Sequence, residues 1–185
     1  MGTVPSWHPP RGDVWVPDGY NVHMVFTHQE VMMARYSASG SQALQSSASG
    51  DATALSFCAQ STAHRNTVYE LWMGNEGAPA DLTTVYTIAR VTTDGASSDT
   101  VTPTPLDPGD RASQCTCLEN HTTEPTYTSG GEILEIPLNH RATFRWVAAP
   151  GGEIITPATD NNGLGLKAIH ASATTDFRMG AMWEE

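Results

Sequence analysis

Basic residues, and lysine above all, are scarce in this chain. Nine of the 185 residues are basic, only Lys167 among them is a lysine, and twenty residues are acidic, so the formal net charge is −11. A protein that binds nucleic acid neutralises phosphates with clustered lysine and arginine, whereas the arginines here are scattered along the sequence. We therefore expect no nucleic-acid partner. An acidic surface instead favours solubility and mutual repulsion between molecules.

Cysteine and long apolar runs are also scarce. The three cysteines, Cys58, Cys115 and Cys117, are an odd number and few for this length. A disulfide framework is therefore not expected, and we predict reduced, mostly buried thiols. The apolar runs are too short to cross a bilayer, and residues 1–15 lack the basic start and apolar core of a secretory signal. We expect no membrane association.

Recognisable catalytic and metal-binding motifs are missing as well. No serine lies in a nucleophile-elbow context, and no glycine-rich loop has the pattern that cradles a phosphate. Among the seven histidines, His23 and His28 are five residues apart and would point to opposite faces of a strand. These observations predict a protein that is not an enzyme and has no cofactor and no metal site. The enzymatic alternative is a hydrolase whose pair of carboxylates is brought together by the fold.

What the chain does contain is a pattern of alternating apolar and polar residues. It is clearest in the stretch Arg141 to Pro157, RATFRWVAAPGGEIITP. The parity that includes Phe144 and Trp146 is apolar, which is typical of a strand with one buried face. Pro150 to Gly152 then interrupts the strand, and residues 153–156 form a second short run. We predict a hairpin at the centre of the core, with the arginines of the opposite parity paired to carboxylates of neighbouring strands or subunits.

The same period of two recurs along most of the chain. It predicts strands over residues 22–27, 54–59, 66–73, 83–92, 112–118, 132–138, 164–171 and 177–183. Residues 94–110 and 119–131 are predicted as long connections, because they are polar or rich in proline. About eight or nine short strands without a helical stripe indicate an all-β fold, a jelly-roll-like β-sandwich or barrel. The long connections favour the jelly roll over an up-and-down meander.

Composition divides the chain into three parts. Residues 1–35 are predicted to form an extended, Pro- and Trp-rich N-terminal arm and the first strand, residues 36–51 a Ser/Ala/Gly-rich linker or loop, and residues 52–185 the β-sandwich domain. Proline fixes an extended backbone, and exposed tryptophan is unfavourable, so we expect the arm to lie against a protein surface. The residues predicted to form this interface are Trp7, Pro9, Pro10, Trp15 and Val16.

Three segments carry a resemblance to one class of protein. They are Thr84 to Asp110 (TVYTIARVTTDGASSDTVTPTPLDPGD), Asn139 to Ala168 (NHRATFRWVAAPGGEIITPATDNNGLGLKA) and the terminal MWEE, Met182 to Glu185. In their local sequence patterns they resemble small all-β virion proteins of tailed bacteriophages, namely capsid-decoration or cement proteins and related head or tail accessory proteins. The resemblance covers a little over half of the chain and contains no single diagnostic motif.

This resemblance implies a non-enzymatic structural protein of the virion. It further implies a homo-oligomer, commonly a trimer in that class, bound to the outside of the capsid at junctions between major capsid protein subunits. The alternative is a glycan-binding or receptor-binding β-sandwich module of a tail or adhesion protein, because exposed indole rings stack on sugars. Trp7, Trp15 and Trp72 are the candidates for such rings.

Overall fold

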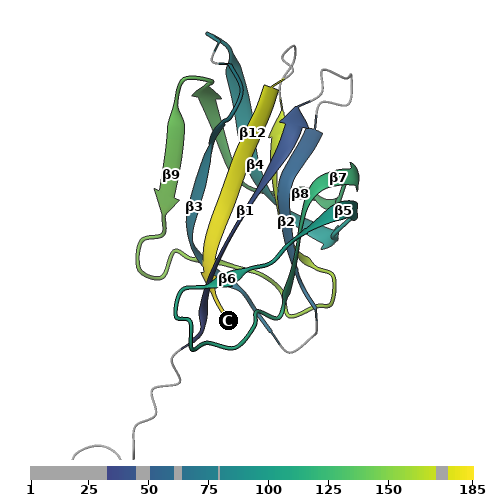
Figure 1. Ribbon diagram of the computed structural model, residues 1–185, viewed down its shortest axis with the longest axis vertical. Helices are drawn as coiled ribbons and strands as arrows, with labels where there is room; N and C mark the ends of the chain where they lie inside the picture. Colours follow the sequence, from purple (N-terminus) through teal and green to yellow (C-terminus); the bar gives the residue numbers. More distant parts are fainter. Residues whose placement is uncertain (1–32, 45–50, 61–63, 79, 170–174) are drawn as a thin grey trace, which may run out of the picture. The chain divides into compact units, whose positions relative to one another are not determined.

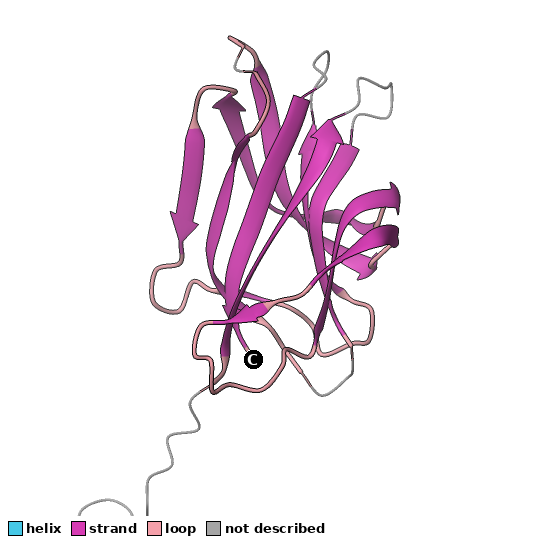
Figure 2. Ribbon diagram, viewed as in Figure 1, coloured by secondary structure: helices cyan, strands magenta, loops and turns pink. Residues whose placement is uncertain are grey.

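All the regular structure in the described residues is β-strand (Figure 2). The computed structural model describes residues 33–44, 51–60, 64–78, 80–169 and 175–185. These residues contain twelve strands and no helix, which confirms the prediction of an all-β fold. The strands are β1 (Arg35–Leu44), β2 (Asp51–Ala59), β3 (Thr67–Asn75), β4 (Thr83–Thr93), β5 (Ala96–Val101), β6 (Thr104–Pro105), β7 (Cys115–Thr123), β8 (Thr126–Asn139), β9 (Thr143–Val147), β10 (Ile154–Ile155), β11 (Gly163–Ile169) and β12 (Thr175–Glu184).

The strands form two antiparallel sheets that face each other as a sandwich (Figure 1). In the first, sheet A, the order is β10-β3-β12-β1-β6, and β9 also pairs with β3. In the second, sheet B, the order is β5-β7-β2-β11-β4-β8. At one side of the sandwich β1 packs against β2 and β7, and towards the middle β12 packs against β2 and β11. This alignment places β9 and β8 together at the opposite side.

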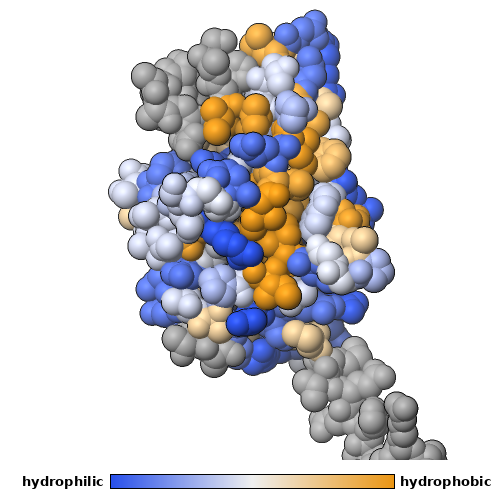
Figure 3. All heavy atoms as spheres, turned by 180° about the vertical axis from the view of Figure 1, so that it is seen from behind, coloured by the Kyte–Doolittle hydropathy of each residue, from blue (hydrophilic) through white to orange (hydrophobic). Residues whose placement is uncertain are grey.

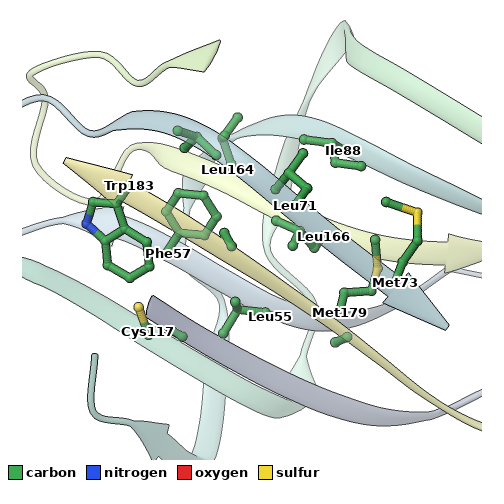
Figure 4. Close-up of a cluster of buried hydrophobic side chains, with 14 of the residues drawn as sticks. Leu55, Phe57, Leu71, Met73, Ile88, Cys117, Leu164, Leu166, Met179 and Trp183 are labelled. Carbon is green, nitrogen blue, oxygen red and sulfur yellow. The ribbon is translucent and has the colours of Figure 1, made fainter. Parts of the chain in front are cut away.

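The core lies between the two sheets and is built from the inward parity of each strand. On β12 this parity is Phe177, Met179, Ala181 and Trp183, and all four side chains are buried. They meet residues of sheet B such as Leu55, Phe57 and Leu164 (Figure 4). The predicted last strand is thus confirmed, and it is a central strand of sheet A, because β12 pairs with β3 on one edge and with β1 on the other.

The prediction of a linker over residues 36–51 is wrong for its first part. Residues 36–44 belong to β1, which pairs along its whole length with β12, whereas residues 45–50 lie outside the described residues. The two inward residues that follow Tyr36 on β1, Ala38 and Gly40, are small, because β1 approaches β2 closely. A Cβ atom on Gly40 would lie 2.2 Å from the backbone oxygen of Ala54. The Ser/Ala/Gly-rich composition of this segment, which suggested a linker, is therefore what the close contact between β1 and β2 requires.

The predicted long connections over residues 94–110 and 119–131 are also largely wrong. Residues 96–101 form β5, the edge strand of sheet B, and β7 and β8 extend through most of the second segment. Most side chains of β5 are exposed, so burial imposes no alternation on its sequence. Its hydrogen bonds to β7 hold it in the sheet despite the polar composition.

The predicted hairpin over residues 141–157 is wrong in its pairing. Strands β9 and β10 do not pair with each other; both pair with β3, β9 along Glu70–Gly74 and β10 along Thr67 and Val68. They are two parts of one edge strand, separated by a turn in which the Gly152 N–H donates to the Ala149 carbonyl at 2.7 Å. The stretch therefore lies at the edge of sheet A and not at its centre.

Strand β8 likewise does not form a hairpin with β9. It pairs with β4 in sheet B, whereas β9 belongs to sheet A, so residues 140–142 carry the chain from one sheet to the other. The strand predicted over residues 132–138 is confirmed as part of β8, and Leu134, Ile136 and Leu138 pack against the core. His140 fixes the connection between the two sheets. Its ring Nε2 lies 2.7 Å from Thr84 Oγ1, and its backbone N–H donates to the Leu82 carbonyl.

Candidate functional site

The residues predicted to form the arm interface cannot be placed in the fold. Trp7, Pro9, Pro10, Trp15 and Val16, with the predicted first strand over residues 22–27, lie outside the described residues. Of the three tryptophans considered as glycan-binding rings, the structure describes Trp72, which lies on β3.

The described residues contain no group of three or more His, Cys, Asp or Glu side chains arranged to hold a metal ion. Among the same residues, no helix is long and apolar enough to span a bilayer. The three cysteines are free and buried, as predicted. Burial raises the pKa of the Cys58 and Cys115 thiols well above the usual range, so both stay protonated at neutral pH.

A polar cluster lies on the outer face of sheet B. His121 Nε2 is 2.9 Å from Ser56 Oγ, and its Nδ1 is 3.2 Å from the Thr53 carbonyl oxygen. Thr53 Oγ1 also contacts the Glu124 carboxylate, and it lies 2.6 Å from the Tyr127 hydroxyl. Ser56 and His121 are both buried, so the pair presents no accessible nucleophile. These contacts attach the end of β7 and the start of β8 to the sheet beneath them.

The outer face of sheet A carries a pocket of about 390 Å³ beside Trp72. Register explains its lining: Arg145 of β9 lies opposite Trp72 on one side, and Gly180 of β12 lies opposite it on the other. A Cβ atom on Gly180 would lie 2.2 Å from Cζ2 and 2.7 Å from Nε1 of Trp72, so the indole ring lies across the glycine. The lining residues are Trp72, Met73, Gly74, Asn75, Glu76, Thr143, Phe144, Arg145 and Arg178.

Two ion pairs fix the charged side chains around this pocket. Arg145 binds Glu70 through two hydrogen bonds, Nε to Oε1 at 2.5 Å and Nη2 to Oε2 at 2.7 Å. Arg178 Nε donates to Glu76 Oε1 at 2.5 Å. The bonds from Arg145 lower the pKa of the Glu70 carboxyl, and they raise that of the Arg145 guanidinium. The charged side chains at the pocket therefore balance each other.

Asn75 adds a hydrogen-bonding group to the same lining. Its Oδ1 accepts from the Gly77 N–H at 2.8 Å and from Thr175 Oγ1 at 2.7 Å. Its Nδ2 is buried and has no hydrogen-bond partner in the described part of the chain. Such an atom costs about 1–3 kcal/mol when it stays unsatisfied. Asn75 therefore lines the pocket, but the surrounding protein atoms cover this donor.

The side of the sandwich between β8 and β9 is the second candidate site. Here the two sheets end without a further described strand to cover their inward residues, and we call it the open side, defined by Leu134, Ile136, Leu138, Phe144 and Trp146. All five pack against the core but remain partly exposed. Arg90 of β4 reaches across towards sheet A, since its Nη1 donates to the Ile155 carbonyl at 3.0 Å. Val147 and Ile155 on the adjoining edge are 55% and 47% exposed.

The two arginines of the stretch Arg141 to Pro157 pair with carboxylates, as the sequence predicted. Arg145 pairs with Glu70, and Arg141 pairs with Asp81 at 2.8 Å. Sequence reasoning did not find Arg178 or Gly180, because neither lies near Trp72 in the chain. Their place beside it depends on the register between β3 and β12, which are about a hundred residues apart. A glycine on the outward parity of β12 was the available signal, since it permits close approach of a large ring.

The chain was compared with protein-family models, curated proteins and solved structures. No protein-family model matches the chain, and neither the curated proteins nor the solved structures include a match.

Proposed function

We propose that this chain is a non-enzymatic structural protein of a bacteriophage virion, of the capsid-decoration or cement type, bound to the capsid surface. Its partners are the major capsid protein and further copies of itself, with a trimer as the expected assembly. We infer a jelly-roll-like sandwich as the scaffold and the extended Pro- and Trp-rich arm that precedes β1 as its attachment. The sequence resemblance of the C-terminal half motivates this assignment.

The observation that supports the proposal is the open side. A monomer leaves five large apolar side chains there partly exposed and places Val147 and Ile155 beside them. Contiguous apolar surface of this kind marks protein–protein contacts in soluble proteins. Figure 3, which views the molecule from behind, shows a band of apolar residues between polar flanks. A subunit that assembles into a shell covers such surface, whereas the acidic remainder keeps the free chain soluble.

The edges of the sheets support the same interpretation. Pro137, Glu132 and Glu135 of β8 oppose the pairing of a further strand with its free edge, and the register of β8 shifts where it pairs with β4. Strand β9 carries no proline or acidic residue. An edge strand without these protective features can accept an additional strand from a neighbour. We therefore place the contact with a sister subunit or the shell on the β9 edge.

The decisive experiment is reconstitution on particles that lack the protein. Purified full-length chain is mixed with such particles and sedimented through a sucrose gradient, and its oligomeric state is measured by light scattering. We expect co-sedimentation and a trimer. A strictly monomeric chain, together with virions that contain none of this protein, would refute the assignment.

Two variants separate the contributions of the arm and the open side. Deletion of residues 1–19 should abolish capsid association and leave the far-UV circular dichroism of the β-sandwich unchanged. Val147→Glu places a charge on the β9 edge and should weaken association. Leu106→Glu is the matched control, because Leu106 is similarly exposed, at 46%, but follows β6 at the other edge of sheet A. Equal effects of the two substitutions would exclude the β9 edge as the interface.

A further inference from the structure

We propose that the outer face of sheet A binds a neutral carbohydrate, with the Trp72 indole as the platform for a pyranose ring. This activity differs from capsid attachment, which we assign to the arm and the open side, although the pocket and the open side share β9. It assigns a ligand class to the pocket of about 390 Å³ beside Trp72. Small-molecule sites have volumes of about 300–1,000 Å³, so the pocket fits one or two sugar rings.

The first argument is the way the ring is held. Gly180 gives Trp72 a place to lie across the neighbouring strand, because any larger residue would collide with Cζ2 and Cε2. Trp72 is partly exposed and lines the pocket. The ring is thus fixed against the backbone of β12 and still presents apolar surface to a ligand. A flat aromatic surface that is ordered before binding loses little entropy when a sugar stacks on it.

The second argument is the set of planar polar groups beside the ring. Arg145 uses Nε and Nη2 to bind Glu70, which leaves Nη1 without a partner in the described part of the chain. Arg178 uses only Nε, for Glu76, among the described residues. Sugar hydroxyls accept hydrogen bonds from such donors, and the carboxylates that orient the arginines can accept bonds from the same hydroxyls.

Charge selects a neutral sugar over an anion. Arg145 and Arg178 of the lining are each paired with a carboxylate, so the site offers no excess of positive charge for a phosphate or a uronic acid. The chain as a whole carries a net charge of −11, which further disfavours an anionic ligand. An apolar peptide is disfavoured too, because it would cover the guanidinium donors without giving them hydrogen-bond acceptors.

The experiment uses the full-length chain and a defined set of probes. Maltohexaose, cellohexaose and chitohexaose are titrated by calorimetry, and a printed array of neutral oligosaccharides extends the search. We expect at least one of these probes to bind, and Trp72→Ala to weaken its binding by about tenfold or more. The Trp72 indole N–H signal in a ¹H–¹⁵N spectrum, assigned from Trp72→Phe, should shift during the titration. The signal of the buried Trp183 should not.

Gly180→Ala is the second variant, and it keeps the indole ring while displacing it from the strand. It should weaken binding as Trp72→Ala does, whereas Gly130→Ala, at a position with no atom within 4 Å of the added Cβ, should not. Binding that survives both Trp72→Ala and Gly180→Ala would overturn the proposal, as would the absence of binding to every probe. Deletion of residues 1–19 should leave saccharide binding intact and abolish capsid association, so the two proposals fail independently.

Discussion

Trp183 of β12 stacks on Phe57 of β2, with ring centroids 5.3 Å apart and ring planes inclined by 10° (Figure 4). The pair spans the interior of the sandwich and joins the centre of sheet A to the centre of sheet B. Tyr36 of β1 extends the cluster, with its ring centroid 6.0 Å from that of Trp183. The three rings are fully buried, so they form a large continuous part of the core.

Removal of the Trp183 ring should strongly destabilise the fold. Trp183→Ala leaves a cavity between the sheets, and truncations of this size in a core cost about 3–5 kcal/mol in the free energy of unfolding. Urea denaturation followed by circular dichroism measures the change. Trp72→Ala is the matched control, because it removes the same side chain from the outer face of sheet A. A loss as large for Trp72→Ala as for Trp183→Ala would contradict the packing described here.

The three thiols should be unreactive in the native protein. Cys58, Cys115 and Cys117 are at most 3% exposed. Burial raises the pKa of Cys58 and Cys115, so little thiolate is present near neutral pH. We expect no reaction with an aromatic disulfide reagent at pH 8 without denaturant and the release of three equivalents of chromophore in guanidinium, in line with the count of three free cysteines. Rapid reaction of any thiol in the folded chain would contradict this prediction.

Glu70 should titrate below the usual range of a glutamate. Hydrogen bonds from Arg145 lower its pKa in the folded state, so the pair stabilises the fold above the unfolded-state pKa of about 4.3. That stabilisation disappears as the pH falls through the lower, folded-state pKa of Glu70. Carboxyl ¹³C chemical shifts recorded against pH measure the pKa, and urea denaturation at several pH values measures the stability. Arg145→Gln should return the pKa to the usual range, whereas Arg141→Gln, which breaks the pair with Asp81, should leave Glu70 unchanged.

Glycine substitutions should distinguish a crowded position from an open one. A Cβ atom on Gly163 would lie 2.0 Å from the Phe57 carbonyl oxygen, so Gly163→Ala must separate β11 from β2. We expect a destabilisation of about 3 kcal/mol or more, measured by thermal unfolding. Gly130 has φ of +67° and no atom near its Cβ position. Gly130→Ala should therefore cost only the backbone strain, about 1 kcal/mol. A larger destabilisation by Gly130→Ala than by Gly163→Ala would show that β11 and β2 are not in close contact at Gly163.

The sequence predicts those strands whose inward parity is bulky and whose outward parity is polar. The alternation from Phe177 to Trp183 identified β12, and that of Leu134, Ile136 and Leu138 identified the inward face of β8. Strand β1 was not predicted, because the position of Gly40 has no room for a side chain beside Ala54. Strand β5 was not predicted either, because an exposed edge needs no apolar face. Alternation of apolar and polar residues indicates that one face of a strand is buried. In β1 the buried residues after Tyr36 are small, and β5 buries no side chain fully.

Pairing was harder to predict than strand location. The run from Arg141 to Pro157 has the composition of a hairpin, yet its two halves pair with the same edge of β3. A turn cluster such as Pro150 to Gly152 is compatible with a reversal and also with a loop that returns the chain to its previous direction. Trp72 could be singled out from sequence as a possible sugar-stacking ring. Its pocket could not, because Arg178 and Gly180 reach it only through the register of β12.

The position of β12 also bears on the synthesis of the protein. This strand follows every other described strand in the chain, yet it lies between β3 and β1 in sheet A. Until residues 175–184 have left the ribosome, β1 and β3 have no strand between them, and Phe57 lacks the ring that covers it. Sheet A is therefore completed only after β12 has been translated, and a nascent chain of this protein keeps its core exposed until then.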